Sequence, residues 1–178
     1  MPAQRYRTFA GYNRWANSRL YEFASHLSPD QYKADRGAFF RSVHGTLNHI
    51  LVADRVWMRR FTGTGDAPSR LDTILFDDFA ALSAAREAED NRIVEYVESL
   101  DDATLARDLR HTNMSGDVFS QPLDELLDHF FNHQTHHRGQ AHAVLTHFLG
   151  NERAASLDLI SFQRAIAASR GAANAPKA

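Results

Sequence analysis

Apolar residues recur at spacings of three and four along most of this 178-residue chain, and this periodicity constrains its fold more than any other feature. Such a stripe lies on one side of an α-helix, because a helical turn takes about 3.6 residues. We expect long helices over residues 6–27, 42–61 and 77–100, and a fourth from the Ser120–Pro122 segment to about Phe148. Four long helices with short connections indicate an all-α four-helix bundle.

Two smaller elements are expected beside the bundle. A Ser-Gly-Asp turn at 115–117 separates two short segments, so residues 109–120 should form a small hairpin before the fourth helix. A short C-terminal helix is expected around residues 157–168. The small and polar residues 169–178 are expected to form a disordered tail. We therefore predict a single domain over residues 1–168, followed by that tail.

The composition excludes several classes of protein. Hydrophobic residues make up 43% and charged residues 24%, as in ordinary globular domains, and no apolar run could cross a membrane. A formal charge of −2 favours neither nucleic acid nor an acidic lipid surface as a partner. The chain has no cysteine, which excludes disulfides, thiolate ligands and a cysteine nucleophile and fits a cytoplasmic protein.

Four of the ten histidines fall within residues 129–137, in the stretch HFFNHQTHH. At 100° per residue these histidines and Gln140 span about 100° of a helix, on the side that carries several apolar residues. We expect this side to face the bundle interior. Buried imidazoles need partners, since an unpaired buried polar group costs roughly 1–3 kcal/mol. The side chains expected there are His129, His133, His136, His137 and Gln140.

Two histidines four residues apart on a helix can both reach one metal ion. His133 and His137 have this spacing, and so do His129 and His133, so spacing leaves both pairs open. A third ligand should come from another helix, and His49, in the middle of the second, is the first candidate. His44, near the start of that helix, is a weaker one. The competing interpretation is that these histidines are packed core residues with ordinary hydrogen-bond partners.

Three further residues have structural interpretations. Arg138 lies about 140° from His133 on the helix, so it should brace a neighbouring helix, with Asp54 as a partner. Trp15 and Trp57 are expected to be core aromatic residues.

The chain resembles the DinB/YfiT-like family of four-helix-bundle metalloenzymes. The similarity lies in YNRWAN (12–17), SVHGTLNHILVADRVWMRRF (42–61), NHQTHHRGQ (132–140) and DLISF (158–162). In that family three histidines hold a divalent metal, commonly zinc or nickel. By motif position they correspond here to His49, His133 and His137. His129, His136 and Gln140 then remain as pocket residues or partners of the ligands. The resemblance also implies a homodimer.

The resemblance implies an activity as well. Family relatives include enzymes that use low-molecular-weight thiols, so the expected function is a metal-dependent thiol S-transferase acting on small electrophiles. The alternatives are a metal-dependent hydrolase that uses bound hydroxide, and a non-enzymatic metal- or ligand-binding protein of stress response. The sequence nominates no general base outside the histidines and does not identify the substrate.

Overall fold

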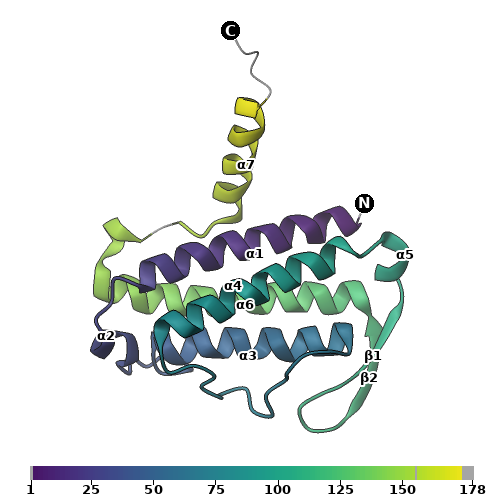
Figure 1. Cartoon of the computed structure of the whole chain (residues 1–178), viewed down its shortest axis with the longest axis horizontal. Coiled ribbons are helices and arrows are strands. Elements are labelled where there is room, and N and C mark those ends of the chain that lie inside the picture. Colours follow the sequence, from purple (N-terminus) through teal and green to yellow (C-terminus); the bar gives the residue numbers. More distant parts are fainter. Residues whose placement is uncertain (1, 155, 174–178) are drawn as a thin grey trace.

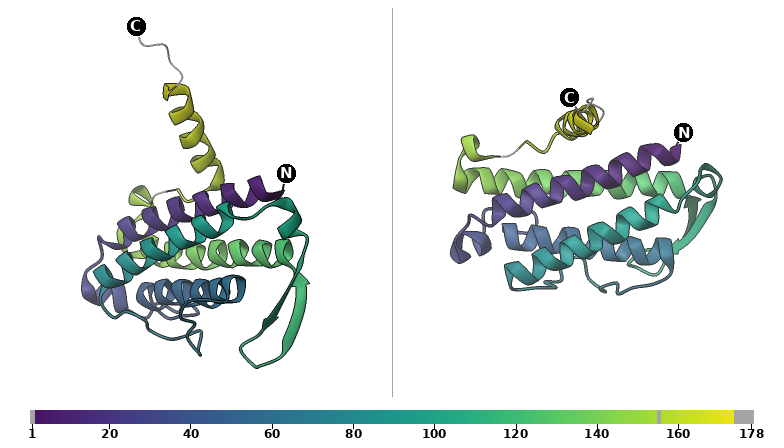
Figure 2. Two further views of the ribbon diagram at one scale, coloured as in Figure 1. Left: turned by 45° about the vertical axis from the view of Figure 1, so that its right-hand side comes forward. Right: turned by 45° about the horizontal axis from the view of Figure 1, so that its top comes forward.

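The computed structural model describes residues 2–154 and 156–173 and has the predicted all-α fold. The bundle consists of α1 (Pro2–Ala24), α3 (Val43–Thr62), α4 (Phe79–Glu98) and α6 (Leu123–Leu149). Helices α1 and α3 each pack against both α4 and α6, as the views in Figures 1 and 2 show. The connection 63–78 runs back along the outer side of α3 (Figure 1).

Short elements close the ends of the bundle. These are α2 (Pro29–Lys33), α5 (Asp102–Leu105), the 3-10 turn η1 (Asn151–Arg153), and an antiparallel hairpin of β1 (Asp108–Thr112) and β2 (Val118–Pro122). Helix α7 (Leu159–Ala173) projects from the bundle beside α1 (Figure 1). It therefore includes residues 169–173, which were expected to belong to a disordered tail. Residues 174–178 of that tail lie outside the described residues.

The helix boundaries follow from local hydrogen bonding. Ser28 caps α2 in a capping box with Gln31, and Ser42 caps α3 through the amide of Gly45. Helix α6 begins at Leu123, directly after the expected Ser120–Pro122 segment, but Ser120 lies in β2 and no side chain caps the helix. The first amide of the helix, at Leu123, instead donates to the carbonyl of Arg107, the residue that precedes β1.

The core is divided by a layer of buried polar residues. One apolar cluster, including Met58 and Phe130, lies toward the hairpin, and a second, including Leu47 and Leu145, lies toward α2. Between them, at mid-height of the bundle, each long helix contributes polar side chains that are at most 3% exposed. This polar layer consists of Asn13, Asn17, Asp54, Arg86, Asp90, Gln134 and Arg138.

In the part of the chain that the structure describes, no helix combines the length and the apolar character needed to cross a membrane.

Candidate metal centre

Helices α3 and α6 bring three of the predicted histidines together at mid-height of the bundle. One ring nitrogen each from His49, His133 and His137 lies within 4.8 Å of the other two, which is close enough for a single metal ion. His133 and His137 are one turn apart on α6, and their ring centroids are 4.4 Å apart. The ring centroid of His49, from α3, lies 4.4 Å from that of His137 and 5.3 Å from that of His133.

Hydrogen bonds on the far side of two rings determine which nitrogen faces the centre. Nδ1 of His49 lies 2.8 Å from the carbonyl oxygen of Leu71, and Nδ1 of His137 lies 2.8 Å from Oε1 of Gln140. Because these oxygens can only accept, both Nδ1 atoms must carry the hydrogen. In the neutral rings both Nε2 atoms therefore present lone pairs, and these two atoms are only 3.2 Å apart. A cation between them and His133 would relieve that repulsion, so the residues fit a metal ion.

The same surroundings keep the rings neutral, as metal ligands must be. Burial lowers the pKa of His49 to about 4, although the hydrogen bond to Leu71 opposes the shift. Burial and the neighbouring His137 and His49 lower the pKa of His133 to about 3. Burial also lowers the pKa of His137, against the effect of the Gln140 hydrogen bond. At neutral pH all three imidazoles are thus unprotonated and able to donate a lone pair.

An aromatic side chain from the segment before α3 covers one side of the centre. The ring of Phe40 stacks on His49 with centroids 3.7 Å apart, and its edge meets His137 at 5.5 Å. The carbonyl of Phe40 is held close to the first turn of α3, where a Cβ on Gly45 would lie 2.1 Å from its oxygen. Gly45 therefore permits the approach that places Phe40 over the histidines.

The remaining histidines of the cluster lie beside this centre rather than in it. His129 and His136 are exposed and Gln140 is half-buried, so the prediction that this whole side of the helix faces inward was wrong. Helix α6 is rotated so that Gln134 and Arg138 point into the core, which leaves these positions at the edge of the contact with α3. His129 still borders the centre, with its ring centroid 5.9 Å from that of His133. The amide of Gln140 also contacts Nε2 of His136, at 3.1 Å.

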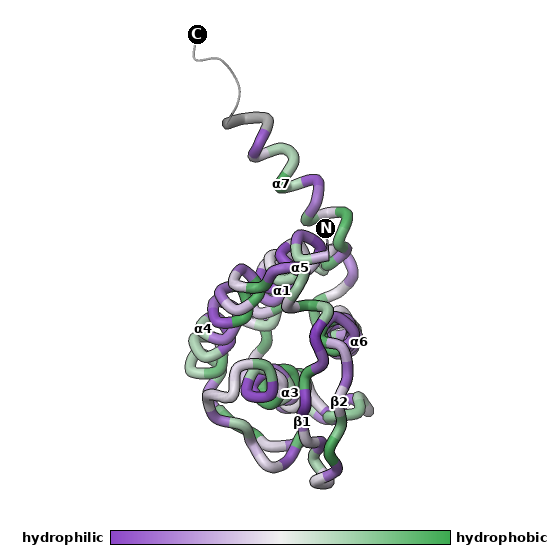
Figure 3. The backbone as a smooth tube through the Cα atoms, turned by 90° about the vertical axis from the view of Figure 1, so that its right-hand side faces the viewer, coloured by the Kyte–Doolittle hydropathy of each residue, from purple (hydrophilic) through white to green (hydrophobic). Residues whose placement is uncertain are grey.

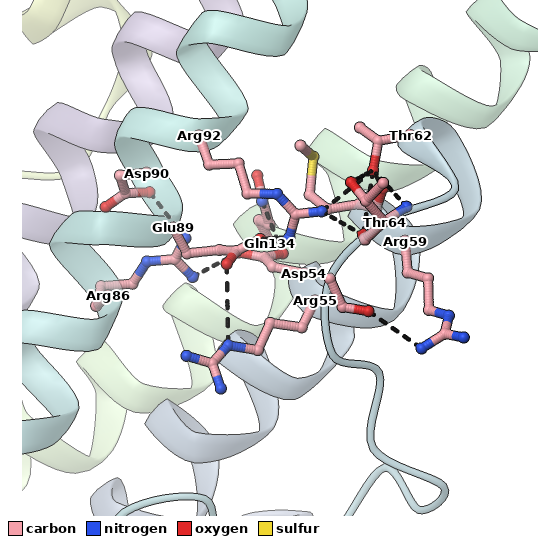
Figure 4. A network of polar contacts seen from close by, with 12 residues as sticks. Asp54, Arg55, Arg59, Thr62, Thr64, Arg86, Glu89, Asp90, Arg92 and Gln134 are labelled. Atoms are coloured by element: carbon pink, nitrogen blue, oxygen red, sulfur yellow. Dashed lines mark hydrogen bonds and ion pairs between the residues drawn. The ribbon is translucent and has the colours of Figure 1, made fainter.

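Arg138 braces a neighbouring helix, as expected, but with different partners. Its guanidinium donates to the side-chain oxygens of Asn13 and Asn17 on α1. Asp54, the expected partner, instead accepts from Arg86 at 2.5 Å and from Gln134 at 2.8 Å (Figure 4). Burial raises the pKa of Asp54 to about 6, and the hydrogen bonds from these two residues act against the shift.

The amides of Asn13 and Asn17 both donate to Asp90, which also pairs with Arg86 at 3.0 Å. The polar layer thus holds two arginines and two aspartates, linked through amides across four helices. The sequence did not predict this polar layer, because charged residues usually lie on the protein surface. It contains no ligand of the centre, but the Asp54–Gln134 hydrogen bond links α3 to α6 close to the histidines.

Three other aromatic residues lie outside the three-histidine cluster. Trp15 and Trp57 are only partly buried, and each packs against an apolar cluster of the core. His44 lies apart from the centre, with Nε2 3.1 Å from the carbonyl oxygen of Phe76.

Two grooves of about 890 and 910 Å³ run along the two sides of α1, and none of the three clustered histidines lines either. The candidate site is therefore defined by its donor atoms and not by the size of a hollow.

A four-helix bundle with three clustered histidines on two facing helices belongs to the class of helical proteins with a candidate metal site in the bundle. The chain is a member of the DinB family, whose sequence profile matches residues 1–165. Among curated proteins it is similar to Protein DinB of Bacillus subtilis (strain 168), with 26% identity over 147 residues. That alignment covers 75% of this chain and 80% of the relative. The predicted family is confirmed.

Proposed function

We propose that this protein is a metal-dependent enzyme in which His49, His133 and His137 hold one divalent ion, zinc or nickel. Its proposed activity is the transfer of a low-molecular-weight thiol to a small electrophile. The observation that carries the proposal is the pair of Nε2 atoms 3.2 Å apart, each left with a lone pair by the acceptor behind its ring. The centre has three neutral imidazoles and, among the described residues, no fourth side-chain ligand. Catalytic metal sites commonly have three protein ligands and an open position, whereas structural sites have four.

The residues around the centre orient the ligand rings and cover one side of the centre. The Leu71 carbonyl and the Gln140 amide fix the directions of two ligand rings, as hydrogen-bond partners of ligands do in metal sites generally. Phe40 covers one side of His49, so a substrate must approach from the side of His133, which is only partly buried. A divalent ion bound at this centre would supply positive charge that stabilises a thiolate or hydroxide at neutral pH.

Group transfer then requires a proton acceptor and a sulfur nucleophile. The chain has no cysteine, so the sulfur must arrive with the cosubstrate. The thiol loses its S–H proton, and the sulfur forms a bond to the electrophilic carbon while the leaving group departs with its electron pair. In this proposal His129 takes the proton, and the support for this role is that its ring borders that of His133. Although the residue is largely exposed, partial burial of the ring and the neighbouring Arg60 lower the pKa of His129, which favours the neutral imidazole that can accept a proton.

The test begins with elemental analysis of protein purified without a histidine tag, followed by turnover of a haloarene in the presence and absence of a small thiol. We expect about one divalent ion per chain and conjugation that requires both thiol and metal. His49→Ala should abolish both, whereas His147→Ala, which removes an exposed histidine at the far end of α6, should abolish neither.

Each other outcome contradicts a specific part of the proposal. Turnover with water alone would indicate a hydrolase. Stoichiometric metal without turnover under either condition would indicate a binding protein. Absence of metal from protein that is folded by circular dichroism would refute the metal site.

A further inference from the structure

The side chain of Gln134 is fully buried directly beside one of the three clustered histidines. It follows His133 in α6, and its amide donates at 2.8 Å to Oδ1 of Asp54 on α3. Because an ionised carboxylate can only accept, the amide must turn its NH2 group to Asp54. Its Oε1 is left buried without a hydrogen-bond partner among the described residues. A buried acceptor without a partner opposes folding, so the burial of this amide needs a reason other than stability.

Asp54 is held from two sides. Seen from the end of the bundle, α3 lies between α4 and α6 (Figure 3). Oδ1 of Asp54 accepts from Gln134 of α6, and Oδ2 accepts from Arg86 of α4 at 2.5 Å. All three side chains are at most 2% exposed, and the bond from the guanidinium is charge-assisted and therefore strong. The carboxylate thus connects three helices at one point of the polar layer (Figure 4).

The three-histidine centre depends on how α3 and α6 lie against each other, because its ligands come from both helices. The rings of His49 and His137 are each oriented by an acceptor behind Nδ1. The ring of His133, among the described residues, has contacts only with other histidine rings. Its place relative to His49 therefore follows from the place of α6. The unfavourable 3.2 Å approach of the two Nε2 atoms must also be held by other contacts between these helices.

We infer that Gln134 and Asp54 are positioning residues of the centre, and that their hydrogen bond sets the spacing of α3 and α6 that brings the three histidines together. Gln134 is adjacent to His133 and three residues before His137, and Asp54 lies five residues after His49. The bond therefore acts within two helical turns of every ligand. Neither side chain belongs to the ligand set. That the spacing serves a metal rests on the proposed function, but the spacing itself does not.

The polar layer offers a matched contact away from the centre. The amide of Asn17, on α1, donates at 2.9 Å to Asp90 on α4, which pairs with Arg86 at 3.0 Å. In both contacts an amide thus donates to an aspartate that pairs with the same guanidinium, but α1 and α4 carry none of the three histidines. Asn17 also accepts from Arg138 at 3.4 Å, and Asn13 remains as an acceptor for that guanidinium when Asn17 is replaced.

The first test compares zinc binding by Gln134→Met and Asn17→Leu, in competition with a chelating dye. Each substitution removes one amide from a buried aspartate and nearly keeps the side-chain volume. Gln134→Met should raise the zinc Kd about tenfold, the lower end of the effect of residues that orient metal ligands. Asn17→Leu should leave the Kd unchanged. Its Tm should fall at least as far as that of Gln134→Met, which also removes an unpaired acceptor, so lost stability cannot explain a Kd that rises only in Gln134→Met.

The second test needs no metal. The chain has no cysteine, so nitroxide labels can be attached at exposed positions of α3 and α6 after Arg59→Cys and Ala143→Cys. The distribution of distances between the labels is measured by double electron–electron resonance in metal-free protein. It should shift or broaden when Gln134→Met is added and should match that of the labelled wild type when Asn17→Leu is added.

The two tests separate this inference from the proposed function. Wild-type protein that binds no zinc would refute the proposed function, and the label distances would still decide the inference. Unchanged distances in Gln134→Met would overturn it, and so would a zinc Kd that rises equally in both variants. Altered distances with the zinc Kd of wild type would overturn it as well, because the contact would then support the bundle without positioning the ligands.

Discussion

Removing the side-chain acceptor behind His137 should weaken metal binding while leaving the bundle folded. In Gln140→Leu the Nδ1 hydrogen of His137 loses an acceptor that lies 2.8 Å away, and the ring is free to rotate or to change tautomer. Gln140 is half-buried near the C-terminal part of α6, and leucine is a good helix former, so the helix itself should persist.

The magnitude follows from the role of this hydrogen bond. Loss of a hydrogen-bond partner behind a metal ligand generally costs about 10- to 100-fold in metal affinity, which is about 1.4–2.8 kcal/mol. We expect a value near the lower end, because water can reach a half-buried site and replace part of the bond. The other contact of the Gln140 amide, at 3.1 Å to Nε2 of His136, involves an exposed ring and should add little.

The assay is competition for zinc between the protein and a chelating dye, with unfolding of each metal-free variant measured in parallel. Gln140→Glu restores an acceptor and should bind zinc at least as tightly as wild type. Gln163→Leu makes the same exchange at an exposed position of α7 and serves as the matched control. If Gln140→Leu bound zinc as tightly as wild type, the tautomer argument for the centre would be refuted.

Three further predictions concern stability. Arg86→Met leaves two buried carboxylates, of Asp54 and Asp90, without their cation. The free energy of unfolding should fall by about 3–5 kcal/mol and the Tm in calorimetry by about 6–20 °C. A loss of unfolding free energy below about 1 kcal/mol would contradict this role. Gly45→Ala places a Cβ 2.1 Å from a backbone oxygen and should destabilise the protein by about 1–3 kcal/mol in urea unfolding. Gly139→Ala meets no atom within 4 Å and should stabilise it by up to about 1 kcal/mol. The reverse order of stability would contradict the packing described. Because the pKa of His49 is lowered to about 4 in the folded state, the metal-free protein should lose stability as the pH falls from about 6.5 towards 4, and a flat urea-unfolding profile over that range would contradict this shift.

Much of the fold could be predicted from local patterns along the chain. The apolar periodicity predicted the four long helices and the Ser-Gly-Asp turn predicted the hairpin, and the structure confirms the all-α class. The spacing of His133 and His137 ensures that both rings lie on one side of a helix, since i and i+4 are neighbours on any α-helix. By spacing alone, His129 and His133 could bind a metal ion equally well. Motif position in the family favoured His133 and His137 instead. The structure clusters His133 and His137 with His49 and leaves His129 beside them.

Other features depend on how the helices pack against one another. The rotation of α6 about its own axis buries Arg138 and exposes His136. This rotation could not be predicted from periodicity, because packing against α1 and α3 determines which side of α6 faces the core. The acceptors that orient the ring nitrogens come partly from the distant connection at Leu71. Hydrogen bonding within one helix specifies distances along that helix, but distances between helices arise from packing of the whole bundle. The 3.2 Å approach of His49 to His137 is a distance of this second kind.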